Sequence, residues 1–267
     1  MTYMHALSPS QLLDAWEKGL DQASVDRAMT LLCAACPGAL RDESAKLSIG
    51  QRDALLLQLR EWTFGPGLTC LVVCPNCGES LELSLRTDDL RMRSHCAMEH
   101  DSLPAEHENP WTAFKTLPDN SFQANIDGFE LSFRLPNSQD LAILESRKSI
   151  AQNRQWLLER CILSAKDSKG AVCNDHLPAD VLNALLDRMA NLDPQANVRI
   201  GITCPQCGHA WEALFDIASF FWAEINAWAA RVLDEVHLLA SAYGWSEKDI
   251  LAMTPKRRRS YLDRITG

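Results

Sequence analysis

Apolar residues recur every three or four positions over most of the chain, which predicts helices. The longest such run starts near Asp216, a candidate N-cap, and continues to about Tyr243. At 1.5 Å per residue, about 28 residues of helix make a rod of roughly 42 Å. Its apolar stripe needs cover, so we expect it to pack on helices that the same periodicity predicts within residues 1–65, with packing on another chain as the alternative.

The N-terminal helices carry recognisable start and stop signals. Ser8 and Gln11 form one candidate capping box, with Pro9 at the first helical position. Ser48 and Gln51 form a second. The helix that Ser48 opens should end at Gly65, because glycine readily adopts the backbone conformation that terminates a helix.

Strict alternation of apolar and polar residues predicts a hairpin in the middle of the chain. Its strands are Phe122–Ile126 and Phe129–Leu135, joined by the turn Asp127–Gly128. Helical periodicity then returns, with apolar positions from Ile143 to Ile162, and another helix begins at Pro178.

Two short cysteine turns, far apart in the sequence, lie between further strand-like runs. The first reads Cys-Pro-Asn-Cys-Gly at 74–78, and the second reads Cys-Pro-Gln-Cys-Gly at 204–208. A strand, a tight cysteine turn and a returning strand make one half of a zinc ribbon. Two halves supply four thiolates, which together coordinate a zinc ion in a closed tetrahedron.

The candidate ligands of one structural Zn²⁺ are therefore Cys74, Cys77, Cys204 and Cys207. Closing a loop of about 126 residues instead of about 16 costs only about 2 kcal/mol more, whereas a structural zinc contributes on the order of 10–16 kcal/mol. The alternative is two independent thiol pairs or disulfides. Four protein ligands leave no open position, so this metal should stabilise structure and perform no chemistry.

These elements together predict an α+β fold, mostly helical, with a split four-cysteine zinc ribbon of two knuckle hairpins and an inserted hairpin-plus-helices segment. We divide the chain into N-terminal helices (1–65), a first knuckle hairpin (66–90), an exposed linker (91–121), the inserted hairpin and helices (122–197), a second knuckle hairpin completing the ribbon (198–215), and a long C-terminal helix with terminal helices packing on 1–65 (216–267).

Two other groups of potential metal ligands are less specific. Cys33 and Cys36 have C-x2-C spacing but lie in an apolar helical stretch, which favours buried thiols over a second metal or redox site. Within the polar 91–121 segment, four residues match no metal motif, and we interpret them as part of a solvated linker: His95, Cys96, His100 and His107.

Composition, charge and the absence of catalytic motifs exclude several classes of function. The chain is 23% charged, with a net charge of −9, which argues against general binding to phosphate backbones. A basic run at 256–259 leaves a nucleic-acid role as an alternative, although a solvated face or a docking patch is more usual. Ten cysteines without a secretory leader, and no apolar run of membrane length, indicate a cytoplasmic protein without a membrane segment. The common catalytic motifs do not occur in the sequence, so we expect neither an enzyme nor a small-molecule substrate.

Several stretches resemble one known family. They are Gly50–Leu57 with Phe64–Gly65, then Cys74–Glu79, Cys204–His209, Asp216–Phe220 and Tyr243–Ile250. From about Leu47 to Leu262 the chain is similar to the baseplate hub-assembly chaperone family of contractile-tailed phages. The zinc-knuckle form of that family occurs beside phage-like contractile injection systems.

The resemblance implies a non-enzymatic role based on protein–protein contacts with a baseplate hub or wedge protein, and it provides no catalytic residues. Members of the family are variously chaperones and structural subunits. Three hypotheses follow: an assembly chaperone, a baseplate subunit retained in the particle, and a zinc-ribbon nucleic-acid adaptor.

Overall fold

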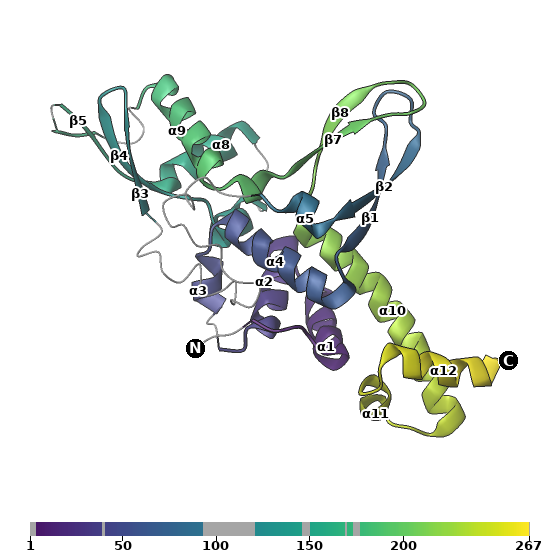
Figure 1. Cartoon of the computed structure of the whole chain (residues 1–267). Helices are drawn as coiled ribbons and strands as arrows, with labels where there is room; N and C mark the ends of the chain where they lie inside the picture. The colour runs from purple at the N-terminus through teal and green to yellow at the C-terminus, as the bar shows by residue number, and fades with distance from the viewer. Residues whose placement is uncertain are drawn as a thin grey trace, which may run out of the picture.

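The computed structural model describes residues 4–38, 41–92, 121–145, 150–168, 170–172 and 177–266. The fold is α+β and mostly helical, as the sequence predicts. Figure 1 shows a central helical body, two hairpins on one side of it, a small sheet with its helices on another, and a helical tip around the C-terminus. The segment with His95, Cys96, His100 and His107 lies outside the described residues.

The helical body is built from helices whose caps the sequence specifies. Both predicted capping boxes are confirmed, at Ser8 with Gln11 and at Ser48 with Gln51, and Gly65 ends its helix at φ 87°. Buried leucines and alanines of these helices form one apolar core with the first half of the long helix. The helices of the body are α1 (Pro9–Gly19), α2 (Ser24–Ala35), α3 (Arg41–Ala45), α4 (Ile49–Phe64) and α10 (Ile217–Tyr243).

Helix α10 begins and ends as predicted. The Asp216 side chain accepts bonds from two backbone N–H groups of its first turn, and Gly244 follows its last residue in the left-handed conformation, at φ 68°. The first half of α10 packs on α1, α2 and α4. Its second half shares a core with Leu13 of α1, with the short helix α11 (Glu247–Leu251) and with α12 (Pro255–Thr266). Helices α11 and α12 form the tip of the molecule (Figure 1).

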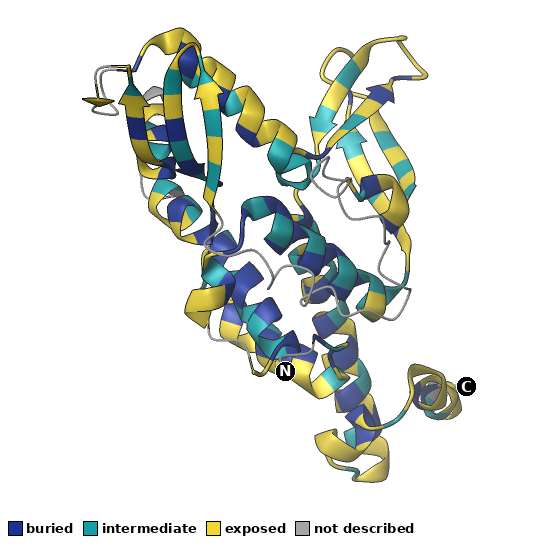
Figure 2. Ribbon diagram, turned by 60° about the vertical axis from the view of Figure 1, so that its left-hand side comes forward, coloured by how far each residue is buried: buried dark blue, intermediate teal, exposed yellow. Residues whose placement is uncertain are grey.

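The middle of the chain forms a second unit with its own core. The predicted hairpin is confirmed as β3 (Ser121–Ile126) and β4 (Phe129–Arg134), and two further strands extend it into a sheet of order β3-β4-β5-β6. Figure 2 shows the colour alternating along these strands, with exposed and intermediate residues in β3 and buried residues added in β4. The remaining elements are α7 (Ser138–Glu145), α8 (Ile150–Cys161), β5 (Ile162–Asp167), β6 (Gly170–Ala171), α9 (Ala179–Leu192) and the 3-10 turn η3 (Pro194–Asn197).

One helix expectation was wrong. The helical stretch through Ile162 ends at Cys161, and Ile162 is the first residue of strand β5. Its apolar side chain continues the helical periodicity of α8, but pairing with Phe133 of β4 holds its backbone extended. Tertiary pairing therefore overrides a short-range pattern that does not distinguish the two states.

The middle unit is held on the helical body at the start of α4. The backbone N–H of Gly50 donates to the Asp193 carboxylate at 2.9 Å, and the N–H of Ile49 donates to the Pro136 carbonyl at 3.1 Å. A Cβ atom on Gly50 would lie 1.9 Å from an Asp193 oxygen, so only glycine allows this approach. Among the described helices, none has the length and hydropathy needed to span a membrane.

Candidate metal centre

Each cysteine turn closes a two-stranded hairpin. The first hairpin pairs β1 (Gly67–Val73) with β2 (Ser80–Arg86), and the second pairs β7 (Arg199–Thr203) with β8 (Ala210–Leu214). Figures 1 and 2 both show the two hairpins side by side. In each hairpin, six residues separate the last strand pair, so the two cysteine turns have equal length.

The two turns also repeat the same hydrogen bonds. In the first, the Cys74 N–H donates to the Glu79 carbonyl at 2.8 Å and the Gly78 N–H donates to the Cys74 carbonyl at 3.0 Å. The second repeats these bonds between Cys204 and its own turn, at 2.8 and 2.9 Å. Gly78 and Gly208 have φ values of 77° and 71°, a region that favours glycine. The sequence thus specifies two copies of one ligand-presenting turn.

The turns bring the four predicted ligands together. The sulfur atoms of Cys74, Cys77, Cys204 and Cys207 all lie within 4.8 Å of one another, although 127 positions separate Cys77 from Cys204. Across the hairpins, Cys74 Sγ lies 3.7 Å from Cys207 Sγ, and Cys77 Sγ lies 3.6 Å from Cys204 Sγ. Among the described residues, this is the only convergent group of three or more potential metal ligands.

These distances fit a tetrahedral metal ion. Metal–sulfur bonds of about 2.3 Å in a regular tetrahedron place the sulfurs about 3.8 Å apart. Two of the ligands, Cys74 and Cys204, are buried, whereas Cys77 and Cys207 are exposed. A closed set of four thiolates favours a soft or borderline metal ion and leaves no position for a substrate.

Two of the clustered thiols, Cys77 and Cys207, have pKa values shifted in opposite directions. A hydrogen bond from Asn76 and a backbone bond at His209 lower the pKa of Cys207 to about 6. A backbone bond at Glu79 lowers the pKa of Cys77, but desolvation and the neighbouring thiols outweigh it and raise that pKa to about 12. The Cys77 thiol therefore keeps its proton at neutral pH, and a bound cation would stabilise its thiolate.

The hairpins are attached to the helical body at their bases. Leu68 of β1 and Val198, just before β7, are buried in the same core as α4 and α10. Near the end of α4, which leads into β1, the Arg60 guanidinium donates to both oxygens of Glu224 at 2.8 and 2.6 Å and to the Gly65 carbonyl at 2.6 Å. The body thus fixes where both hairpins begin, which places their turns opposite each other.

Cys33 and Cys36 do not join the cluster of four cysteines. They lie at the end of α2, where Cys36 is buried and Cys33 is half-buried. Burial and the neighbouring Cys33 thiol raise the pKa of Cys36 to about 11, so it stays a neutral core thiol at neutral pH.

The basic residues 256–259 do not form one continuous exposed surface. Arg258 is 2% exposed, and its guanidinium donates to Glu235 of α10 at 2.8 Å and to the Met253 carbonyl at 3.0 Å. The expectation of a solvated or docking cation was therefore wrong at this position. Arg259 pairs with Asp263 on the surface at 3.0 Å.

Sequence reasoning missed an aromatic cluster at the helical tip. Tyr243 and Trp245 stack with ring centroids 4.5 Å apart, and Tyr261 meets Trp245 edge-on at 4.8 Å. Arg257 and Arg264 both lie 5.9 Å from the centre of the Tyr261 ring. We call these five residues the tip cluster. The sequence shows the positions of Tyr243, Trp245 and Tyr261, but the contacts among their rings depend on the turn at Gly244.

Sequence comparison relates this architecture to one known protein family. No curated protein and no solved structure matches the chain. One family does: the sequence model of the T4 bacteriophage base plate protein family matches residues 10–222 of the 267, from the first helix through both cysteine hairpins into α10. The chain therefore belongs to the T4 bacteriophage base plate protein family.

Proposed function

We propose that this protein is a non-enzymatic assembly chaperone of the baseplate hub, which binds a hub or wedge subunit before that subunit is incorporated. Family membership is the observation that carries the baseplate part of this proposal. The chaperone part draws on the sequence resemblance and on apolar side chains that are left exposed in the isolated chain. A chaperone of this kind must cover a partner surface that would otherwise aggregate.

The first knuckle hairpin offers such side chains. Leu71 is 74% exposed and Val73 is 63% exposed, and they share the outer face of β1. Leu214 of the second hairpin is 64% exposed. Because neighbouring positions on each strand turn toward the covered face, these three apolar side chains are available to another protein.

The tip cluster offers a second contact of a different chemistry. Stacked Tyr and Trp rings with flanking arginines are enriched where interfaces derive most of their energy. Trp222 and Trp228 pack against the core of the helical body, whereas Trp245 and Tyr261 pack, also partly buried, against the core of the tip. The burial of Arg258 also reduces the basic surface on which a nucleic-acid adaptor would depend.

We further propose that the metal is Zn²⁺ and that its role is structural. Four thiolates at tetrahedral separations are the donor set of structural zinc sites. The ion would hold the two hairpins together, and with them the exposed face of β1, without taking part in any reaction.

Deletion of the gene tests the functional proposal. We expect assembled particles to disappear and the hub or wedge subunit to move to the insoluble fraction, because its contact surface is left uncovered. Complementation with Leu71→Ser/Val73→Ser should restore few particles, since both side chains are exposed and their loss should leave the fold intact. The matched control is Leu163→Ser, another exposed leucine, 53% accessible, on β5. Normal particles from the deletion strain would reject any role in assembly.

A further inference from the structure

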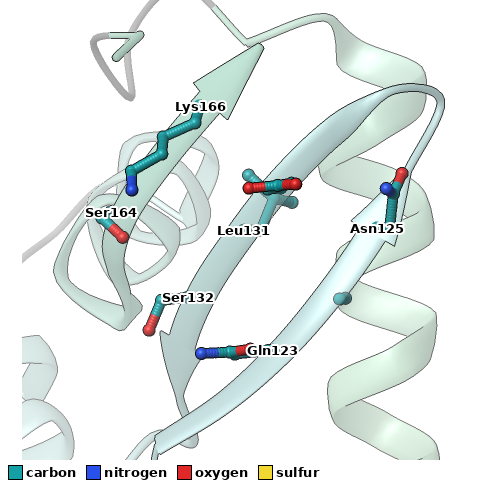
Figure 3. A pocket seen from close by; sticks show the side chains of 8 residues that line it. Gln123, Asn125, Leu131, Ser132, Ser164 and Lys166 are labelled. Carbon is teal, nitrogen blue, oxygen red and sulfur yellow. The ribbon is translucent and has the colours of Figure 1, made fainter. Parts of the chain in front are cut away.

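Strand β3 is an outer edge of the four-stranded sheet. It pairs with β4 along its whole length, and on the far side of the sheet the other edge is β6, of only two residues. Figure 3 shows β3 beside β4, with no further strand along its outer side among the described residues. An edge of this kind presents unpaired backbone N–H and C=O groups.

The pairing pattern shows which backbone groups point outward. The Val172 N–H donates to the Ala165 carbonyl, so the backbone of Ala165 faces β6 and away from β4. Leu131, opposite Ala165, must therefore bond to β3, where its partner is Ala124. Because bonding direction alternates along a strand, the N–H and C=O groups of Gln123 and Asn125 point away from the sheet. No described residue bonds to these outward groups.

This edge has none of the residues that commonly block an edge strand, although helix α9 packs beside it. Natural edge strands are commonly blocked by charged side chains, proline or a bulge. Strand β3 reads Ser-Phe-Gln-Ala-Asn-Ile, with no charge and no proline, and it pairs with β4 in unbroken register. In contrast, the strand at the other edge, β6, is only two residues long. The open edge is therefore a feature of β3 in particular.

A groove follows the edge. It has a volume of about 380 Å³ and lies between β3 and α9, where Ala184 and Arg188 form its wall. Arg188 is exposed and makes no ion pair with any described residue. On the opposite face of the sheet a shallow hollow of about 390 Å³ is lined by polar side chains, including Gln123, Asn125 and Lys166 (Figure 3). An added strand would thus find space beside α9 for the side chains that it points toward that helix.

We propose that the β3 edge binds an extended segment of another protein by strand addition, and that this segment places a carboxylate against Arg188. Backbone bonds to Gln123 and Asn125 would provide affinity, and the small side chain of Ala184 leaves room for the incoming residue. A second copy of this chain fits less well, because symmetric pairing of two β3 edges would bring two Arg188 side chains toward the same groove. The proposal does not depend on the chaperone role or on the metal.

A labelled heptapeptide, acetyl-Thr-Val-Thr-Asp-Thr-Val-Thr-amide, tests the proposal by fluorescence anisotropy with the full chain. The Asp and Val side chains share one face of an extended strand and would point toward α9. Gln123→Pro removes one outward N–H while leaving the bonds to β4 in place, and proline is tolerated at such edge positions. We expect binding at least about tenfold weaker for Gln123→Pro, and binding close to wild type for the matched Gln123→Ala.

Two further measurements separate loss of the backbone bond from misfolding and test the contact with Arg188. A peptide N-methylated at the residue opposite Gln123 removes the same bond from the ligand side, so it replaces Gln123→Pro if circular dichroism shows that variant to be misfolded. Changing the peptide Asp to Lys should weaken binding in wild type, and Arg188→Ala should remove that difference. Equal binding by the Pro and Ala variants, or no binding of the Asp peptide at millimolar concentration, would overturn the proposal. A dimer of the chain that Gln123→Pro dissociates would overturn it in favour of a second copy.

Discussion

Replacement of Cys204 with serine is expected to release the metal and to separate the two cysteine hairpins. A two-stranded hairpin is at best marginally stable alone, and structural zinc contributes on the order of 10–16 kcal/mol in small zinc-binding peptides. With three thiolates the site loses its closed tetrahedron. The helical body should stay folded, because its core is formed mainly by α1, α2, α4 and α10.

Metal analysis and limited proteolysis of the purified protein check this expectation. Wild type should carry one equivalent of zinc, and Cys204→Ser should lose it and become susceptible to cleavage within 66–90 and 198–215. Cys70→Ser is the matched control: this thiol lies in β1, is half-buried and does not belong to the sulfur cluster, so its replacement should retain the metal. A fully loaded Cys204→Ser protein with unchanged melting would contradict the metal centre.

Replacement of Asp140 with asparagine is expected to destabilise the middle unit by about 1.5–3 kcal/mol, the usual contribution of hydrogen bonds to a charged group. The carboxylate is 0% exposed and accepts two bonds from Arg134, at 2.6 and 2.9 Å, one from Arg160 at 2.9 Å and one from the Asn137 N–H at 3.0 Å. Removing its charge leaves two guanidinium groups without a counterion. The exposed Asp187→Asn on α9 should leave the urea midpoint nearly unchanged.

The destabilisation caused by Asp140→Asn should become smaller as the pH falls. Burial alone raises the pKa of Asp140, but the bonds from Arg134 and Arg160 outweigh it and hold that pKa below its ordinary value. A lowered carboxyl pKa stabilises the fold above the unfolded-state pKa of about 3.9, and this contribution is lost as the pH falls through the folded value. The difference in unfolding free energy between wild type and Asp140→Asn should therefore be full at pH 7 and should shrink below about pH 4. A difference that persists unchanged in acid would show that lost packing, not charge, is responsible.

The sequence predicted the parts of this fold that depend on local chemistry. Ser8 and Ser48 cap helices because their partners lie three residues away, and the Asp127–Gly128 turn requires two positive φ values that these residues tolerate. The cysteine turns were recognisable because each contains its own closing glycine. The meeting of the two turns followed from the chemistry of four thiolates and not from their separation in the sequence.

What the sequence did not predict depends on contacts between distant segments. Strand β5 exists because β4 offers it a bonding edge, although Ile162 also suits the end of α8. Arg258 is buried because Glu235, 23 positions earlier, faces it from α10. The approach of Asp193 to Gly50 likewise joins residues 143 positions apart. Periodicity and composition contain no information about such pairings.

Quantitative mass spectrometry of purified particles tests the central functional claim most directly. The amount of this chain is measured in wild-type particles and, as a reference, in the cell lysate from which they were purified. An assembly chaperone should be abundant in the lysate and absent or substoichiometric in the particle, because it leaves once its partner is incorporated. Presence in every particle at a fixed, symmetric stoichiometry would contradict the chaperone role and identify the protein as a structural baseplate subunit.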